Sequence, residues 1–134
     1  MSAVPTLAIT SGEPAGVGPE LCARLAMRRW PARLVVIGDR ALLASRLAAA
    51  GCGAVQDYRP DAAIAAGTLE VVHVPLRAPA EAGRLDAANA AYVLETLDRA
   101  IDVVGFGIAL VLLYYGALAV FVLELAAKIF VQRL

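Results

Sequence analysis

The sequence predicts an α/β fold, in which a partial parallel sheet with flanking helices is followed by a long hydrophobic C-terminal helix. Two observations lead to this prediction. Short apolar runs of strand length alternate with segments of helical periodicity through about residue 102. The 21 residues Val103–Leu123 then contain no charged residue and no Asn, Gln, His or Pro. We therefore expect two parts, residues 1–102 and residues 103–134.

The first β-α unit lies at the N-terminus. Thr6–Thr10 is a short apolar run bounded by Pro5 and by a glycine-rich loop, which is typical of a buried strand. Pro19 in a first helical turn predicts a helix that continues to about Arg29. Trp30-Pro31 should end it, because the residue before a proline disfavours helical geometry.

The second β-α unit gives the clearest strand signal. Arg33–Gly38 contains a continuous apolar run with three consecutive β-branched residues, as expected for a parallel strand that is buried on both faces. Arg40–Ala50 has helical periodicity, and Gly51 is suited to close that helix.

A third β-α unit follows a polar connection over Tyr58–Ala66. Leu69–Val74 is predicted to be a strand, and Pro75–Gly83 a loop. Asp86 should cap a helix that runs through at least Asp102. The residues predicted to form the buried face of this helix are Ala90, Val93, Leu94, Leu97 and Ile101.

The order of these units predicts that the three strands lie parallel, side by side in the order of the chain. The carboxyl ends of the strands, where open α/β sheets bind ligands, should then carry the glycine-rich loop. An incomplete sheet of this kind would leave an exposed edge that favours aggregation unless a partner covers it.

Composition excludes some functions. The chain has 12 basic and 12 acidic residues, so a nucleic-acid partner is not expected. Cys22 and Cys52 are isolated in the sequence and are expected to be buried, reduced thiols. The N-terminus shows no secretory signal pattern, which places the first hundred residues in the cytoplasm as an expectation.

The loop after the first strand contains Gly12, Glu13, Gly16 and Gly18. Its glycines permit unusual backbone angles or a close approach, and the N-terminus of the next helix suits an anion. The loop lacks the third glycine of a dinucleotide fingerprint and the Gly-Lys-Ser/Thr of a phosphate-binding loop. A tight strand-to-helix turn is favoured over a ligand-binding loop, and both remain open.

Several blocks of this sequence resemble the N-terminus of the 4-hydroxythreonine-4-phosphate dehydrogenase family of pyridoxal phosphate (vitamin B6) synthesis. The blocks are Leu7–Glu20 (LAITSGEPAGVGPE), Trp30-Pro31, Leu34–Asp39, Gly67–Leu69 and Ala88–Ala100. The resemblance covers residues 1 to about 102. It implies an α/β/α fold like that of isocitrate dehydrogenase, working as a homodimer with NAD and a divalent metal. The implied reaction is oxidation of 4-phosphohydroxy-threonine followed by decarboxylation.

The resemblance places Gly12, Glu13, Gly16 and Gly18 near the active site and assigns no catalytic residue. The histidines that hold the metal in the family lie beyond the match, and His73 is the one histidine of this chain. One imidazole cannot build a metal site, so His73 is expected to be a packed or edge residue of its strand. We expect the chain alone to bind neither NAD nor metal and to be inactive. The alternative is a small membrane-anchored protein that binds a partner or a phosphorylated ligand without catalysis.

The resemblance to the family ends where the apolar run begins. As a helix, residues 103–123 would be about 31 Å long, which matches the hydrocarbon core of a bilayer. Residues 124–134 are amphipathic, as in an interfacial segment. We expect a tail anchor in the inner membrane, with the α/β part in the cytoplasm. A buried helix of a packed fold remains an alternative, as does a tail produced by a frameshift, a fusion or a misjoined gene model.

Overall fold

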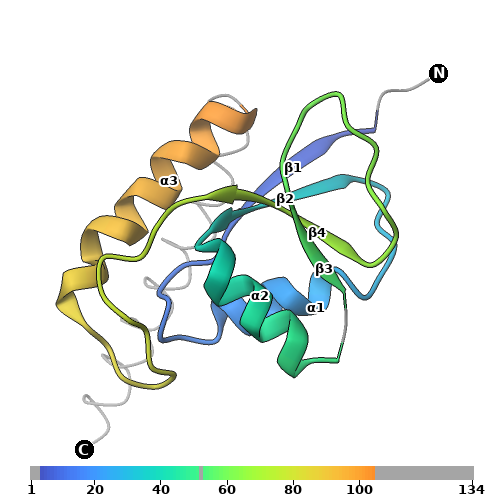
Figure 1. Ribbon diagram of the computed structural model, residues 1–134. Coiled ribbons are helices and arrows are strands. Elements are labelled where there is room, and N and C mark those ends of the chain that lie inside the picture. The colour runs from blue at the N-terminus through green and yellow to red at the C-terminus, as the bar shows by residue number, and fades with distance from the viewer. Residues whose placement is uncertain (1–3, 52, 105–134) are drawn as a thin grey trace, which may run out of the picture.

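A computed structural model describes residues 4–51 and 53–104, and in this part the chain forms an α/β fold around one parallel sheet (Figure 1). The spatial order of the four strands is β1-β2-β4-β3. The three predicted strands are therefore confirmed, as are their parallel pairing and their order. The strands are β1 (Thr6–Thr10), β2 (Arg33–Gly38), β3 (Ala54–Asp57) and β4 (Thr68–His73).

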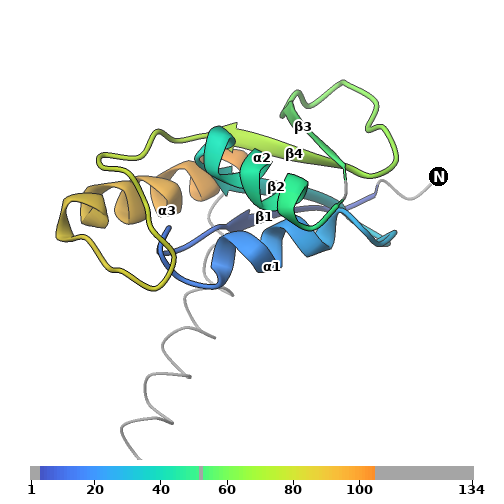
Figure 2. The ribbon, with the colours of Figure 1, turned by 60° about the horizontal axis from the view of Figure 1, so that its bottom comes forward.

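Three helices flank the sheet on both faces. The helices α1 (Gly18–Leu25) and α2 (Arg40–Ala49) lie side by side on one face (Figure 2). On the other face, α3 (Ala90–Val104) packs on β1 and β2. A 3₁₀ turn, η1 (Ala87–Asn89), precedes α3, and the Asp86 carboxylate caps it by accepting a hydrogen bond from the Ala88 amide at 2.9 Å.

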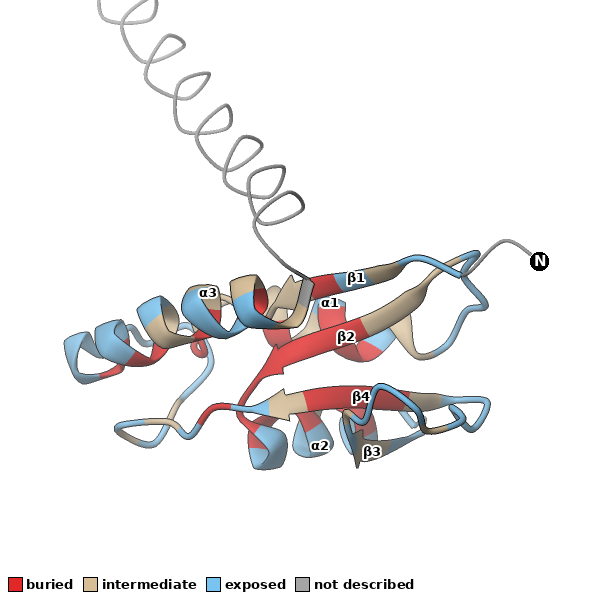
Figure 3. Ribbon diagram, turned by 90° about the horizontal axis from the view of Figure 1, so that it is seen from above, coloured by how far each residue is buried: buried red, intermediate tan, exposed pale blue. Residues whose placement is uncertain are grey.

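Each face of the sheet has its own apolar core, and the central strands β2 and β4 are the most deeply buried (Figure 3). Between the sheet and α1 and α2 lie Cys22, Ala23, Val36, Leu43, Leu47, Leu69 and Val71. Between the sheet and α3 lie Ala8, Ile37, Val74, Tyr92 and Ala100. Successive residues of β2, Val36 and Ile37, thus enter opposite cores, which explains its continuous apolar sequence.

The strand β3 was not predicted from the sequence. This strand has four residues, of which Gln56 and Asp57 are polar, so it carries no apolar run. It forms because it lies parallel to β4, with Ala54 opposite Thr68 and Asp57 opposite Val71. A short, polar strand at the edge of a sheet is defined by its neighbour rather than by its own sequence.

The helix α1 ends at Leu25, four residues before the predicted end at Arg29. The next residues make a tighter turn, in which the Met27 amide donates to the Arg24 carbonyl at 3.2 Å and the Arg28 amide to the Leu25 carbonyl at 3.3 Å. The Trp30 indole N–H also donates to the Leu25 carbonyl, at 3.0 Å. The helix therefore closes before the Trp30-Pro31 pair that was expected to stop it.

The buried face of α3 differs from the predicted one. Tyr92, Thr96 and Ala100 face the sheet, whereas Leu94 is 64% exposed. Ala90 is exposed as well, and Val93, Leu97 and Ile101 are half-buried. The predicted apolar residues therefore lie along one flank of the helix rather than on its inner side. Polar side chains can occupy the inner side because their polar groups are hydrogen-bonded: the Thr96 hydroxyl, for example, donates to the Val93 carbonyl at 2.7 Å.

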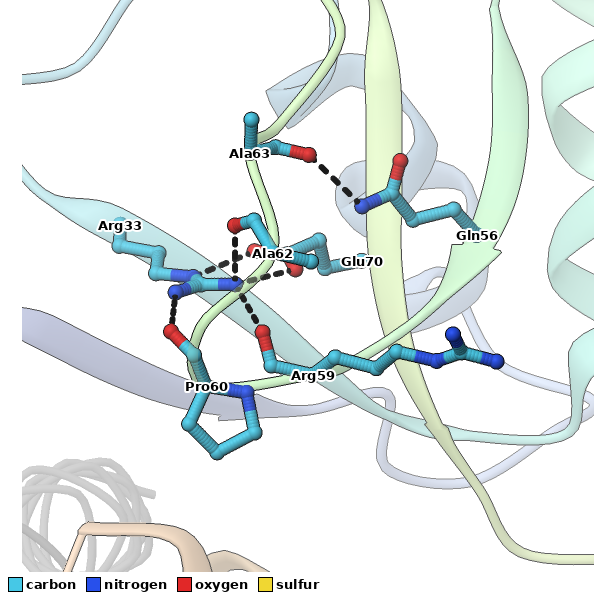
Figure 4. A network of polar contacts seen from close by, with 7 residues as sticks. All are labelled: Arg33, Gln56, Arg59, Pro60, Ala62, Ala63 and Glu70. Atoms are coloured by element: carbon cyan, nitrogen blue, oxygen red, sulfur yellow. Dashed lines mark hydrogen bonds and ion pairs between the residues drawn. The ribbon is translucent and has the colours of Figure 1, made fainter.

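A buried ion pair crosses the sheet between β2 and β4 (Figure 4). The Arg33 guanidinium donates to both oxygens of Glu70, at 2.8 and 2.7 Å, and the Glu70 side chain is fully buried. The same guanidinium donates to the carbonyls of Arg59, Pro60 and Ala62. Arg33 therefore ties the connection between β3 and β4 to the face of the sheet.

The predicted transmembrane helix and its amphipathic end lie outside the described residues, except for the start of the apolar run in α3, and so does Cys52. Among the helices of residues 4–51 and 53–104, none has the length and apolar character needed to cross a bilayer.

Candidate functional site

The candidate site lies at the carboxyl edge of the parallel sheet, where ligands bind in open α/β folds. The loop Ser11–Val17 follows β1, Asp39 follows β2, and His73 is the last residue of β4. Parallel pairing brings these three ends to the same edge. The fold therefore places the predicted glycine loop where the sequence analysis expected it.

The glycine loop is a compact turn whose glycines serve the chain's own backbone. Gly12 has a φ of +68°, which other residues rarely adopt. The Gly16 amide donates to the Glu13 carbonyl at 3.0 Å. At Gly18, a Cβ atom would lie 2.1 Å from the Ser11 carbonyl oxygen, so the two ends of the loop touch. This geometry supports the interpretation as a tight strand-to-helix turn.

The N-terminus of α1 follows this turn directly. Its N-cap residue, Val17, makes no capping hydrogen bond with its side chain, and Pro19 lies in the first turn. An uncapped helix N-terminus carries a partial positive charge that favours an anion. Glu20 already places a carboxylate in the first turn, and this carboxylate pairs with Arg46 of α2 at 3.1 Å.

A buried polar cluster holds the start of the loop against α3. The hydroxyls of Ser11 and Tyr92 lie 2.8 Å apart, and the Tyr92 hydroxyl accepts a hydrogen bond from the Asp39 amide at 3.0 Å. Burial raises the pKa of Tyr92 above its ordinary value, although its hydrogen bonds with Ser11 and Asp39 oppose the shift. The cluster holds the phenol neutral at physiological pH and provides no base to activate Ser11.

A second loop closes over the same edge. The Asn89 side-chain carbonyl accepts hydrogen bonds from the amides of Arg77 and Ala78, both at 3.0 Å, and its side-chain amide donates to the Ala78 carbonyl at 3.2 Å. Further along, the Gly83 amide donates to the Ala15 carbonyl at 2.8 Å. The loop after β4 is therefore fixed to the glycine loop. No sequence signal had identified Asn89 or Tyr92 for these roles.

His73 lies exposed at the carboxyl end of β4, which is an inner strand of the sheet. Its Nδ1 accepts a hydrogen bond from the Arg40 amide at 3.1 Å, while the Arg40 side chain pairs with Asp57 at 2.6 Å. In the part of the chain that the structure describes, no group of three or more His, Cys, Asp or Glu residues is placed to hold a metal ion. The residues present thus do not fit the divalent metal that the family resemblance implies.

The glycine loop does not have the dinucleotide-binding fingerprint either. At Gly18, the Ser11 carbonyl occupies the space in which a ligand could otherwise approach the backbone. The third glycine of the fingerprint is also missing. Cys22 offers no alternative chemistry, because burial raises the pKa of its thiol to about 11. Residues 4–51 and 53–104 therefore contain a positioned loop without an activated nucleophile.

A hollow of about 730 Å³ lies at the opposite, amino edge of the sheet. It is open and largely apolar, and it is far along the strands from the glycine loop. Its lining includes Leu25, Met27, Trp30, Leu34, Ile64 and Thr68. We do not assign it to the candidate site, since it holds none of the predicted site residues.

The chain is similar to curated dehydrogenases and to solved structures. It is 63% identical over 102 residues to a 4-hydroxythreonine-4-phosphate dehydrogenase of Azoarcus sp., covering 75% of this chain and 31% of that relative. A relative with the same description in Aromatoleum aromaticum is 60% identical over 101 residues, covering 75% and 30%. No family model matches the chain.

The fold is shared with a crystal structure of a 4-hydroxythreonine-4-phosphate dehydrogenase from Burkholderia phymatum. The TM-score is 0.67 at 24% identity, and the likeness covers 75% of this chain and 33% of that one. This chain thus spans about a third of the length of the proteins that it matches.

Proposed function

The first three quarters of this chain belong to the 4-hydroxythreonine-4-phosphate dehydrogenase family as its N-terminal portion, and we propose that they act as one part of such an enzyme. The proposed reaction of the complete enzyme is the oxidation of 4-phosphohydroxy-threonine, with NAD as the acceptor and a divalent metal, followed by decarboxylation. The observation that supports this proposal is the 63% identity over 102 residues to the Azoarcus relative.

The contribution of this part is structural support for one wall of the active site. The glycine loop is held at the sheet edge by Gly18 against Ser11, by Tyr92 and by the loop that contains Gly83. The groups for metal binding and hydride transfer must then come from the other two thirds of the enzyme. We therefore expect the chain alone to be inactive, and we expect the assembled enzyme to form a homodimer, as the family resemblance implies.

A chimera tests this proposal. Residues 1–102 of this chain would replace the matched residues of the Azoarcus relative, and NADH formation would be followed with 4-phosphohydroxy-threonine and a divalent metal. We expect the chimera to retain activity within about tenfold of the relative, because the replaced part positions but does not react. The unmodified 134-residue chain should form no NADH. A folded but inactive chimera, or chelator-sensitive activity of the chain alone, would contradict the proposal.

We also propose that residues 103–123 anchor the chain in the inner membrane, with the α/β part on the cytoplasmic side. The proposal is supported by the 21 uncharged residues, whose insertion should be favourable. The full chain should sediment with membranes and resist carbonate extraction, whereas a version that ends at Asp102 should not sediment. Full-length protein that stays monodisperse without detergent would instead indicate a packed core helix.

The second candidate function is a membrane-anchored protein that binds a partner or a phosphorylated ligand without catalysis. The uncapped N-terminus of α1 at the sheet edge favours such a ligand. The chimera distinguishes these two candidate functions. If residues 1–102 come from a protein that does not catalyse the reaction, they should lack residues that the relative's active site needs, and the chimera should be inactive.

A further inference from the structure

The amino edge of the sheet carries apolar side chains on two connections. The connection between α1 and β2 holds Met27 and Trp30, which are 59% and 45% exposed. The connection between β3 and β4 holds Ile64, which is 44% exposed. Both connections line the hollow of about 730 Å³. Exposed apolar side chains that gather at one place, rather than singly over the molecule, mark an interaction surface.

Trp30 is held in a defined position on this edge. Its indole N–H donates to the Leu25 carbonyl at 3.0 Å, so the one polar atom of the side chain is bonded within the chain itself. The ring therefore presents apolar surface to the outside. Large, half-exposed tryptophans of this kind are typical of interfaces and of the boundary between lipid and water.

The charge of this edge is positive. Arg28 and Arg29 lie between the two apolar side chains of the first connection, both are exposed, and the lining of the hollow contains no acidic residue. Among the described residues neither arginine forms an ion pair, whereas the exposed Arg40 and Arg77 each have a carboxylate partner. An anionic partner is therefore complementary to this edge. A second copy docked through the same residues would bring arginines and no carboxylates.

The direction of α3 relates this edge to the proposed membrane anchor. The helix starts at the carboxyl edge, where Tyr92 contacts Ser11, and runs back along the strands (Figure 1). Its last turn therefore lies nearer to the amino edge, and the apolar run starts in that turn, at Val103. An anchor that begins there brings the amino edge, rather than the glycine loop, toward the bilayer.

We propose that the amino-edge surface, formed by Met27, Arg28, Arg29, Trp30 and Ile64, docks on the anionic lipids of the membrane in which the chain is anchored. The orientation rests on the proposed anchor. The apolar side chains enter the headgroup region, and the two guanidinium groups bind lipid phosphates. The cytoplasmic leaflet is negatively charged, and each arginine near it should raise the affinity about fivefold. The glycine loop then lies on the side that faces away from the membrane.

The fluorescence of Trp30 tests this docking directly, because it is the single tryptophan of the chain. The full chain would be reconstituted into vesicles of phosphatidylcholine, with or without about 30% phosphatidylglycerol, in which the acyl chains carry bromine. Bromine quenches a tryptophan only at close range. We expect quenching at least about twofold stronger in the anionic vesicles than in the neutral ones, and a loss of this difference at high salt.

Substitutions on the two connections test the named residues. Arg29→Glu should abolish the dependence on anionic lipid, and Ile64→Asp should weaken the quenching although Ile64 belongs to the other connection. Both residues are exposed, so folding is spared. Arg84→Glu and Leu85→Asp are the matched controls, because they make the same chemical changes at exposed positions in the loop that is fixed to the glycine loop. Both controls should quench like the wild-type chain.

Several outcomes would overturn the proposal. Trp30 is not quenched, quenching is equal in neutral and anionic vesicles, or the controls weaken it as much as Arg29→Glu and Ile64→Asp do. A tryptophan that becomes shielded as the protein concentration rises, or that is shielded in detergent without lipid, would show that a second copy or the chain itself covers the surface.

Carbonate extraction separates failure of the docking from failure of the anchor. A chain that resists extraction but shows no quenching refutes the docking alone. A chain that carbonate removes, but whose Trp30 is quenched in anionic vesicles, refutes the anchor and leaves the docking surface in place.

Discussion

The hydroxyl of Ser11 lies 2.8 Å from the hydroxyl of Tyr92, which is 81 positions away in the chain. Ser11 is the first residue after β1, and Tyr92 belongs to the first turn of α3. The Tyr92 hydroxyl also accepts a hydrogen bond from the Asp39 amide, so this one side chain joins the ends of two strands to the helix that covers them. There is no space for a side chain at this point, because a Cβ atom on Gly38 would lie 2.5 Å from the Ser11 hydroxyl.

Replacement of Tyr92 by Phe should lower the free energy of unfolding by about 1–3 kcal/mol, because the Ser11 hydroxyl and the Asp39 amide would stay buried without this partner. Chemical denaturation of the full chain, followed by the fluorescence of its single tryptophan, measures the change. Tyr58→Phe is the matched control and should change stability by less than about 0.5 kcal/mol, because phenylalanine keeps the half-buried ring that lies 5.1 Å from the Arg33 guanidinium. Equal effects of the two substitutions would contradict this role of the Tyr92 hydroxyl.

Replacement of Arg33 by Met should destabilise the fold by about 3–5 kcal/mol, since it leaves the fully buried Glu70 carboxylate without its bidentate partner. A double variant with Glu70→Met should recover most of this loss, because it removes the unpaired charge. Arg84→Met serves as the control: its pair with Glu81, at 3.5 Å, is highly exposed on both sides. The same denaturation assay applies, and a double variant no more stable than Arg33→Met would show that the carboxylate is not the source of the cost.

Replacement of Gly18 by Ala should cost more than replacement of Gly51 by Ala. Gly51 has a φ of +69° with open space around it, so an alanine there meets only backbone strain of about 1–2 kcal/mol. Gly18 lies in α1, where alanine is intrinsically better than glycine by about 1 kcal/mol. Its added Cβ would nevertheless meet the Ser11 carbonyl at 2.1 Å, which forces the loop to open. A Gly18→Ala variant as stable as wild type would show that the loop does not need this contact.

The strands that the sequence predicted, β1, β2 and β4, are those that contain a short run of consecutive apolar residues. Val35, Val36 and Ile37 are all fully buried, so β2 can be recognised without knowledge of its neighbours. In β3 no such signal exists, because pairing with β4 makes it a strand. The face of α3 was misplaced for a related reason: periodicity finds apolar residues, whereas the inner side of α3 also holds Tyr92 and Thr96, whose polar groups find partners only in the folded chain.

Likewise, only part of the candidate site could be predicted from the sequence. The position of the Gly12–Gly18 loop follows from local order, since a strand precedes it and a helix follows. The contacts that hold the loop depend on Tyr92, Gly83 and Asn89, which are more than 60 residues away in the sequence. No local pattern encodes such long-range pairs.

Cys22 gives the fold a defined sensitivity to alkaline pH. Burial raises the pKa of its thiol from 9.0 to about 11. In the unfolded chain the thiol loses its proton near pH 9, while in the folded chain it keeps the proton up to about pH 11. The folded state therefore binds more protons between these values, and stability falls as the pH rises. The contribution is fully present below pH 9 and is lost by about pH 11.

We accordingly expect the free energy of unfolding to fall between pH 9 and pH 11 by roughly 2–3 kcal/mol more in the wild-type chain than in Cys22→Ala. The comparison isolates this thiol, because Tyr92, whose pKa is also raised, titrates in both proteins. Below pH 9 the variant should be the less stable of the two, since it loses packing against the core of α1, and the two curves should converge as the pH rises. Curves that stay parallel from pH 8 to pH 11 would mean that the Cys22 thiolate is reached by solvent and that this face of the core opens readily.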